Sequence, residues 1–461
     1  MAPPLALALT AGLYAPRALA NGQASHVWIS QRALTDMPEG ELREFVSDPL
    51  LRQMLLNGSM YPDGGYGPVD HPNAHEAAET AHWEPYQDAY RAWIMETYSR
   101  PWSPEAREHI AFYLGMSAHG MGDQVFDSMF MQRSVAYDAT DLADFDQFMD
   151  YILVSLAGEA EIPEDWVPAP ELLVLYEQAG LAYTAQAILD GQAVLRAALS
   201  LINVAASVPA NIETAQMTYP WASEHLLDVQ AEGSPPVEAA VVQRYWQSNW
   251  DLLHGRDLRR PVLFSFPYDG TANHPTDATS VESWISIVFS RGLDAGALGN
   301  DAFMIEAEGG DTVPFNLDLY YGNESHVVHL KPAEDLAVDT VYTVVVEPGI
   351  ATVHGETLDG WAFRFSTGDV PPDPIHDDED WTNPDPPEPP SPPGGDGGDT
   401  DTGDGDGGGP GDADTSSGET ADGGTAETDA ATGCACAHGT RAPNAAWLAL
   451  LAVTWRRRRR T

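Results

Sequence analysis

The sequence predicts a multidomain protein with an all-α domain, then an all-β sandwich, then a disordered acidic linker and an anchoring tail. Between about 25 and 255, apolar residues recur at three-to-four spacing, which is typical of amphipathic helices. Between about 259 and 369, short runs alternate between apolar and polar residues, as strands do. From 370 the chain is rich in Pro, then in Gly, Asp and Thr, and has little to bury.

Composition narrows the classes of partner. The 461 residues exceed what one ordinary core holds, and 70 acidic against 22 basic residues give a formal charge of −48. Such a surface repels nucleic acid, so no nucleic-acid partner is expected, whereas divalent cations are tolerated or attracted. The only cysteines are Cys434 and Cys436, so the predicted domains contain neither a disulfide nor a thiolate metal site.

The first twenty residues are predicted to be a signal peptide. They are apolar and end in Ala18-Leu19-Ala20, which is typical of a signal-peptidase site, although Arg17 follows the apolar run instead of preceding it. A core helix is the alternative. We expect an exported protein whose all-α domain spans 21–258.

The stretch 103–127 is the predicted centre of the all-α domain. Ser103 is expected to cap a helix that begins at Pro104. His119, Asp123 and Asp127 follow at intervals of four, so they should share one face of this helix. An imidazole and carboxylates on a buried stripe are costly unless they are paired or bind a cation. We interpret this face as half of a metal site.

Further possible ligands occur on both sides of this stretch, and zinc favours such mixtures of imidazole and carboxylate. Each also has a plainer interpretation as a cap, a turn or a surface residue, and Asp63 is expected in an exposed Pro-Asp-Gly bend. Among the acidic residues after this stretch, Asp150 included, one or two could bind a metal, and the rest are expected to be solvated surface. The candidates are His26, Asp63, His75, His82, Asp138 and Asp141.

The remaining segments each have their own composition. Seven alternating runs within 259–369 predict a β-sandwich of immunoglobulin type. Residues 370–433 are predicted to be an extended, self-repelling linker. Residues 434–461 combine two cysteines, a short apolar run at 445–455 and five arginines at 456–460, which indicates a sorting or anchoring tail.

Four motifs, in order, resemble the zinc-dependent phospholipase C family, and within it the catalytic domain of glycosylphosphatidylinositol-specific phospholipase D. They are SHVWISQRAL, GSMYPDGGY, HEAAETAHWEPY and IAFYLGMSAHGMGDQVFD. The resemblance implies an all-helical domain that binds up to three Zn²⁺ ions and hydrolyses phosphodiesters, typically of phospholipids.

The resemblance also assigns roles to individual residues. It implies that His26, Asp63, His82, His119 and Asp123 are zinc ligands, with Asp123 bridging two ions and Asp63 a ligand or general base. Asp127 stands where the family usually has histidine, and Asp138 and Asp141 are the nearest substitutes for a later ligand pair. One metal subsite is therefore expected to be rebuilt from carboxylates, which favours a harder ion, or to be lost.

The later segments resemble known modules too. The runs VLFSFPYDGT and FRFSTGD resemble bacterial Ig-like domains, which generally act as spacers or adhesive units. The tail resembles the MYXO-CTERM sorting signal, which implies export, processing near the cysteines and retention at the cell envelope, with Cys434 a possible lipidation site.

Together these features predict an exported, surface-tethered, zinc-dependent phosphodiesterase that acts on phospholipids. A zinc nuclease of the same superfamily is a second hypothesis, which the acidic composition disfavours. A third is a catalytically degenerate surface adhesion or structural protein, because Asp127 and the absent later histidines depart from the family pattern.

Overall fold

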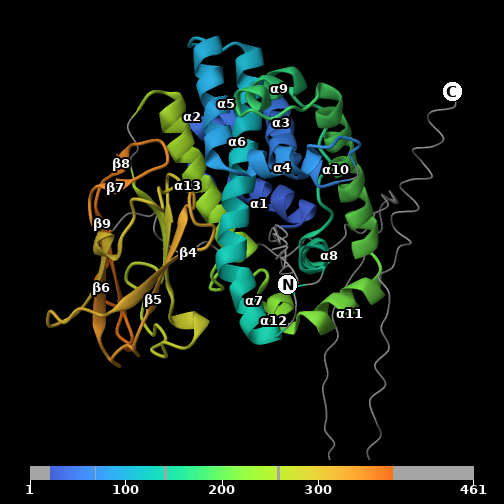
Figure 1. The fold of residues 1–461 in the computed structure, drawn as a ribbon. Helices are drawn as coiled ribbons and strands as arrows, with labels where there is room; N and C mark the ends of the chain where they lie inside the picture. Colours follow the sequence, from blue (N-terminus) through green and yellow to red (C-terminus); the bar gives the residue numbers. More distant parts are fainter. Residues whose placement is uncertain (1–20, 68, 140–141, 143, 257–259, 377–461) are drawn as a thin grey trace, which may run out of the picture. The chain divides into compact units, whose positions relative to one another are not determined.

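The computed structural model describes residues 21–67, 69–139, 142, 144–256 and 260–376 (Figure 1). These residues all fall within one compact unit, 1–393. The predicted signal peptide, most of the predicted linker and the predicted tail lie outside the described residues, and so do Asp141 and Cys434.

The first part of the described chain is helical, as predicted from its periodicity. Most of its helices have a proline at their first or second position. The N–H that proline lacks would have no partner within the helix there, so nothing is lost. In chain order they are α1 (Gln23–Asp36), α2 (Glu41–Val46), α3 (Pro49–Met60), η1 (Tyr61–Gly65), α4 (Ala74–His82), α5 (Glu84–Thr97), α6 (Pro104–Val125), η2 (Phe126–Phe130), α7 (Met131–Asp138), α8 (Phe145–Ala157), α9 (Ala169–Gln178), α10 (Ala185–Ala206), α11 (Pro209–Thr218), α12 (Pro220–His225) and α13 (Pro235–Leu253).

Helix α6 is the central element of this part, with α1, α3, α4, α5 and α13 packed around it (Figure 1). It begins at the predicted residue, because the Ser103 hydroxyl accepts a hydrogen bond from Ala106 N at 3.2 Å. From His109 to Val125 every residue is buried. A helix buried all round must carry its polar side chains toward specific partners.

Two glycines allow α3 to approach α6 very closely. A Cβ atom on Gly115 would lie 1.9 Å from the Leu55 carbonyl oxygen, and one on Gly58 would lie 2.1 Å from the Phe112 carbonyl oxygen. No residue with a side chain fits at either point without moving a backbone. This contact fixes the distance between α6 and the chain that follows α3.

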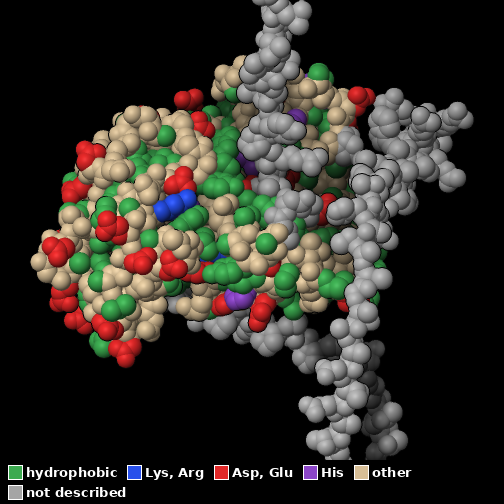
Figure 2. Space-filling view, turned by 60° about the horizontal axis from the view of Figure 1, so that its bottom comes forward, with side chains coloured by type: hydrophobic (Ala, Val, Ile, Leu, Met, Phe, Trp, Pro, Cys, Tyr) green, Lys and Arg blue, Asp and Glu red, His purple; other side chains and the backbone are tan. Residues whose placement is uncertain are grey.

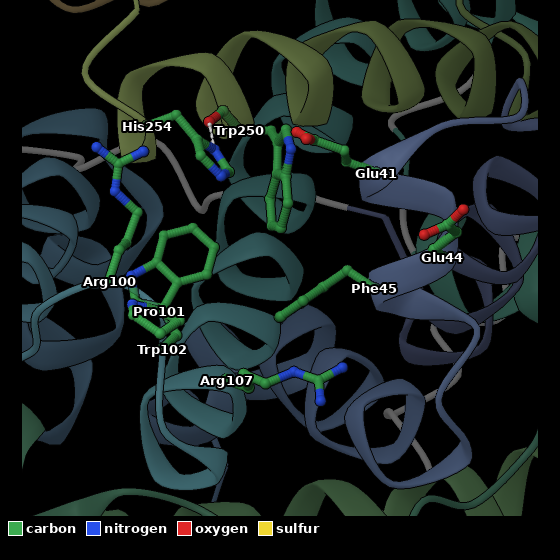
Figure 3. A pocket seen from close by; sticks show the side chains of 9 residues that line it. All are labelled: Glu41, Glu44, Phe45, Arg100, Pro101, Trp102, Arg107, Trp250 and His254. Atoms are coloured by element: carbon green, nitrogen blue, oxygen red, sulfur yellow. Dashed lines mark hydrogen bonds between the residues drawn. The ribbon is translucent and has the colours of Figure 1, made fainter.

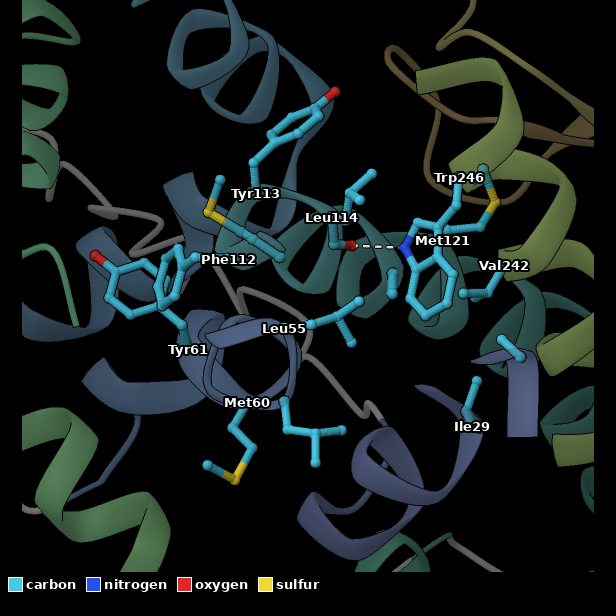
Figure 4. Close-up of a cluster of buried hydrophobic side chains, with 14 of the residues drawn as sticks. Ile29, Leu55, Met60, Tyr61, Phe112, Tyr113, Leu114, Met121, Val242 and Trp246 are labelled. Atoms are coloured by element: carbon cyan, nitrogen blue, oxygen red, sulfur yellow. Dashed lines mark hydrogen bonds between the residues drawn. The ribbon is translucent and has the colours of Figure 1, made fainter. Parts of the chain in front are cut away.

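The hydrophobic core of the helical part surrounds this crossing (Figure 4). Leu55 and Phe112 lie on α3 and α6, and Trp246 comes from α13. The indole of Trp246 is fully buried, and its Nε1 donates a hydrogen bond to the Leu114 carbonyl at 2.7 Å. The large aromatic side chain is therefore buried without an unsatisfied donor.

The second part is all-β, and each of the seven predicted runs forms a strand. Its two main sheets have the orders β1-β2-β5-β4 and β3-β6-β9, with antiparallel pairing throughout, and a short β7-β8 pair adds to them. The strands are β1 (Val262–Phe266), β2 (Ile285–Phe289), β3 (Phe303–Ala307), β4 (Phe315–Leu319), β5 (Val327–Pro332), β6 (Val341–Val346), β7 (Ile350–Ala351), β8 (Thr357–Leu358) and β9 (Trp361–Ser366).

Strands β1, β2 and β5 of the first sheet are buried on both faces, whereas the edge strand β4 is partly exposed. Ile287 and Val328 belong to the core between the two sheets, whereas Val288 and Val327 belong to the core of the helical part. Strand β2 is accordingly buried at every position. The β part therefore shares a hydrophobic interface with the helices and is not a detached module.

Candidate metal centre

Helix α1 carries His26, and its beginning is fixed by a buried aspartate. Asp150 on α8 accepts hydrogen bonds from Ala24 N at 3.0 Å and from Ser25 N and Oγ at 2.8 Å each. These bonds satisfy amide groups in the first turn of α1. Asp150 is not solvated surface, as most of the later acidic residues were expected to be, since it is only 1% exposed. Burial raises the pKa of Asp150 to about 6.

Asp63 lies in the short 3₁₀-helix η1, directly after α3. It is buried, so the expected exposed bend was wrong. The glycines that follow it explain the difference: a Cβ on Gly65 would lie 1.9 Å from the Ala74 carbonyl oxygen, and one on Gly64 would lie 3.4 Å from Gly191 on α10. The absence of side chains lets η1 settle between α4 and α10.

His82 ends α4, and His119 and Asp123 lie on α6, so four elements bring five predicted ligands together. His82 Nε2 lies 3.2 Å from Asp63 Oδ1 and 3.4 Å from Asp123 Oδ2. His119 Nε2 lies 3.3 Å from Asp123 Oδ2 and 3.6 Å from Asp63 Oδ1. His26 Nε2 lies 3.2 Å from Asp123 Oδ1. All five side chains are buried.

Their donor atoms form two overlapping groups in which all ligand atoms lie within 4.8 Å of one another. One group is His26, Asp63 and His119, and the other is His82, His119 and Asp123. His119 belongs to both. Separations of this size suit atoms that bind a common ion at about 2.0–2.2 Å each.

The tautomers of two histidines are fixed by backbone carbonyls. His119 Nδ1 lies 2.7 Å from the Ser59 carbonyl oxygen, and His82 Nδ1 lies 2.7 Å from the Ala78 carbonyl oxygen. Because a carbonyl only accepts, each Nδ1 carries a proton, and Nε2 is the ring nitrogen that each histidine directs toward the cluster. The two Nε2 atoms lie only 3.0 Å apart. Two lone pairs at this distance repel unless a proton or a cation lies between them.

Unsatisfied polar atoms complete the case for a cation. Among the described residues, Asp127 Oδ1 is buried without a hydrogen-bond partner, and His26 Nε2 and Asp123 Oδ2 have ion-pair contacts at 3.2–3.4 Å but no well-aligned hydrogen bond. Unpaired polar atoms away from water are costly, and an ion would use them. The donor set of imidazole nitrogens and carboxylate oxygens is the one zinc favours, so the residues present fit this metal.

The charges of the cluster are strongly coupled. Burial alone would raise the pKa values of Asp63 and Asp123, but the neighbouring histidines, above all the charge of His119, outweigh it and lower both. Burial alone would lower the pKa of His119, but Asp123 and Asp63 raise it to about 10. Burial and the charge of His119 lower the pKa of His26. Both aspartates are thus held as carboxylates that attract a positive charge.

Asp127 lies outside both groups of donor atoms. Helix α6 ends at Val125, and Asp127 sits in the π-helical turn η2, so the expected four-residue spacing does not continue to it. Its Oδ2 accepts a hydrogen bond from the Tyr321 hydroxyl of the β part. Burial, together with the negative charge of Asp123, raises the pKa of Asp127.

The structure separates the other candidates from the cluster. His75 is exposed on α4, and its ring packs against Tyr66 with centroids 4.9 Å apart. Asp138 accepts hydrogen bonds from Trp221 N and the Ser134 hydroxyl at 2.7 Å each, so it serves the beginning of α12. Neither residue belongs to the two groups of donor atoms.

Three residues beside the cluster were missed by the sequence analysis. Asn21 N donates to Asp123 Oδ1 at 3.1 Å, and Asn21 Nδ2 donates to Glu238 Oε2 at 2.6 Å. Gln23 Nε2 donates to Asp63 Oδ2. Glu238 is completely buried at the start of α13, and burial raises its pKa. No periodic pattern marks an Asn or a Gln near the start of a helix, so the sequence alone could not have identified Asn21 and Gln23.

On the face of the molecule drawn in Figure 2, red carboxylate side chains are widespread and blue basic ones are few. A separate pocket of about 440 Å³ lies between α2, the beginning of α6 and the end of α13 (Figure 3). It is lined by Trp102, Trp250 and Arg107, among others, and contains none of the predicted ligands.

The β part has a match among known families. Residues 260–367 match the bacterial Ig-like domain family. This agrees with the predicted immunoglobulin-type sandwich and with the two observed sheets.

The chain is similar over part of its length to one curated enzyme from several species. Phosphatidylinositol-glycan-specific phospholipase D is 26% identical over 132 residues in Bos taurus, which is 28% of this chain and 16% of that protein. The Rattus norvegicus enzyme is 27% identical over 123 residues, 26% of this chain and 15% of the relative. The Dictyostelium discoideum enzyme is 35% identical over 66 residues, 14% and 7% of the two chains. The chain thus spans less than a fifth of the length of these relatives.

Solved structures can also be compared with this chain, and their TM-scores are low. Clostridium perfringens alpha-toxin is 11% identical, with 75% of this chain and 99% of the toxin covered and a TM-score of 0.21. The surface layer protein SbsC, domains 1–6, is 12% identical, with 71% and 46% covered and a TM-score of 0.20. These scores are too low to support a shared fold.

Proposed function

We propose that this chain is a metal-dependent phosphodiesterase that hydrolyses phospholipids with a zinc cluster held by His26, Asp63, His82, His119 and Asp123. One observation supports this most strongly: the Nε2 atoms of His82 and His119 lie 3.0 Å apart, and each Nδ1 is committed to a carbonyl. The sequence similarity to phospholipase D supports the choice of substrate class.

In this proposal the side chains divide the work. His119 would bind an ion through Nε2, the ring nitrogen that no carbonyl occupies, and Asp123 would hold cations with oxygens that face His26 on one side and His82 and His119 on the other. When bound, zinc supplies a Lewis acid for phosphoryl oxygens and lowers the pKa of a water toward ~7. Asp63 accepts a hydrogen bond from Gln23 through Oδ2, and its carboxylate could orient a water or act as the general base that takes its proton.

Export and tethering are further parts of the proposal that rest on the sequence. The predicted signal peptide would deliver the chain outside the cytoplasm, and the tail at 434–461 would retain it at the cell envelope, with Cys434 as the point of processing or lipidation. Both segments lie outside the described residues.

Two alternatives predict different results in one assay. The full chain would be incubated with phosphatidylcholine vesicles, a glycosylphosphatidylinositol-anchored protein and single-stranded DNA, each with and without a chelator. We expect phospholipid cleavage that the chelator removes and added zinc restores. Cleavage of DNA alone would indicate the nuclease, and zinc binding without any cleavage would indicate the degenerate surface protein.

Variants connect the activity to the cluster. His119→Ala removes a donor atom from both groups, so we expect a loss of at least about 100-fold in kcat/KM. His75→Ala is a matched control, because it removes an exposed histidine outside the cluster. Equal activity of the two variants would contradict the proposed site.

A further inference from the structure

The segment between β4 and β5 lies against the parts of the helical domain that carry predicted ligands. The Tyr321 hydroxyl donates to Asp127 Oδ2, and the Tyr321 ring meets Trp83 edge-on with centroids 5.0 Å apart. A few residues later, His326 N donates to Gln124 Oε1 at 2.7 Å.

These contacts fall on the immediate neighbours of two ligands. Trp83 follows His82, and Gln124 follows Asp123. An Ig-like module that served only as a spacer would have no reason to contact these positions. The contacts are buried and polar, since Gln124 and the backbone at His326 lie inside the structure. The β4–β5 segment therefore packs against the stretches of chain that carry His82 and Asp123.

We propose, on the basis of the proposed function, that Tyr321 is a positioning residue of the metal centre. Its hydroxyl holds the Asp127 carboxylate through Oδ2 and leaves Oδ1 as an oxygen ligand for a cation at the edge of the His–Asp cluster. The bacterial Ig-like domain thereby completes the site that the helical domain begins.

The state of Asp127 supports a cation at this place. Its side chain is 2% exposed, and among the described residues Oδ1 has no hydrogen-bond partner. A divalent ion would use this unpaired oxygen. The π-helical turn η2 redirects Asp127 from the regular face of α6, and such turns often occur at functional sites.

The hydroxyl and the ring of Tyr321 can be tested separately. Tyr321→Phe removes the hydrogen bond to Asp127 and keeps the ring against Trp83. Tyr320→Phe is the matched control, because Tyr320 lies in the same segment with its ring 4.8 Å from that of Tyr321. Metal binding to the full-length chain would be measured by titrating Zn²⁺ and Mn²⁺ against a competing chelator.

We expect Tyr321→Phe to weaken the binding of one ion about 10- to 100-fold and to leave the other sites unchanged. Asp127→Asn should cause the same loss, and the double variant should lose no more than either single variant. Tyr320→Phe should bind metal as the unaltered chain does. Circular dichroism would verify that all variants are folded.

Three results would overturn the inference. One is a Tyr321→Phe isotherm that matches the unaltered chain. Another is a double variant whose losses add, because Tyr321 would then act independently of Asp127. A third is an unaltered chain that binds no metal, which would also remove the proposed function. The first two results would refute the inference and leave the proposed function intact.

Discussion

Glu84 of α5 and Arg291, which follows β2, form a buried ion pair between the helical part and the β part. Glu84 Oε1 lies 2.7 Å from Arg291 Nη1, and neither side chain is more than 2% exposed. Glu84 Oε2 accepts a hydrogen bond from Gly292 N at 2.5 Å and lies 3.3 Å from His354 Nε2. The Glu84 carboxylate thus contacts several groups of the β part. Glu84 itself lies two residues after His82 in the sequence.

Glu84→Gln is predicted to destabilise the chain strongly. The substitution keeps the shape of the side chain and leaves Arg291 buried with only Asp88 and Glu356 nearby, at 3.4 Å each. Removing one member of a buried pair typically costs about 3–5 kcal/mol. Urea unfolding of the full chain would measure this loss. A loss below about 1 kcal/mol would mean that the pair does not hold the two parts together.

The same residue predicts a pH dependence. Burial alone would raise the pKa of Glu84, but His326, His354 and Arg291 lower it from 4.5 to about 2. A carboxyl with a depressed pKa in the folded state contributes stability above the unfolded value, and this contribution disappears as the pH falls from about 4.5 through 2. The difference in unfolding free energy between the unaltered chain and Glu84→Gln should therefore shrink across this range. A constant difference would contradict the assignment.

Gly115→Ala is predicted to disturb both the core and the metal centre. The new Cβ would lie 1.9 Å from a backbone oxygen of α3, which no side-chain rearrangement relieves. We expect a loss of stability of about 2 kcal/mol or more, together with weaker zinc binding, because η1 and Asp63 follow α3. Gly296→Ala is the control, since its Cβ would meet only the Asp294 carboxylate, at 3.2 Å. Equal melting temperatures for the two variants would contradict this view of the crossing.

Metal removal should lower the stability of the unaltered chain. An ion that binds only the folded state stabilises it by about 2.7 kcal/mol at a free concentration 100-fold above its Kd. We therefore expect the melting temperature to fall by several degrees with a chelator and to recover with zinc. His119→Ala should show no such response. An identical melting curve with and without the chelator would mean that no ion contributes to folding.

Much of the fold follows from local patterns in the sequence. The change of period from three or four to two near residue 259 separates the helices from the strands, and Ser103 with Pro104 marks where α6 begins. These signals depend only on residues that are close together in the sequence, so they can be recognised without knowledge of the tertiary structure.

The site was predictable only in part. His119 and Asp123 are one helical turn apart, so their meeting follows from helix geometry. His26, Asp63 and His82 could be assigned only from a resemblance to a family, because contacts such as Gly65 with Ala74 that bury Asp63 are set by tertiary packing.

The positions of Asp127 and Tyr321 differ from what the sequence pattern predicts, for structural reasons that periodicity does not reveal. Asp127 leaves the predicted face because the helix changes to π geometry after Val125. Tyr321 lies 194 positions after Asp127 in the sequence, in a segment with no catalytic pattern of its own. Only the packing of the β part on the helices brings it to the centre.

The central claim is that His26, Asp63, His82, His119 and Asp123 share bound cations. X-ray absorption at the zinc edge of the purified full-length chain tests it most directly, because the spectrum distinguishes imidazole, oxygen and sulfur ligands. We predict a nitrogen and oxygen shell at about 2.0–2.2 Å with imidazole scattering and no sulfur. A chain that retains no zinc, or a shell of sulfur at about 2.3 Å from Cys434 and Cys436, would contradict the account.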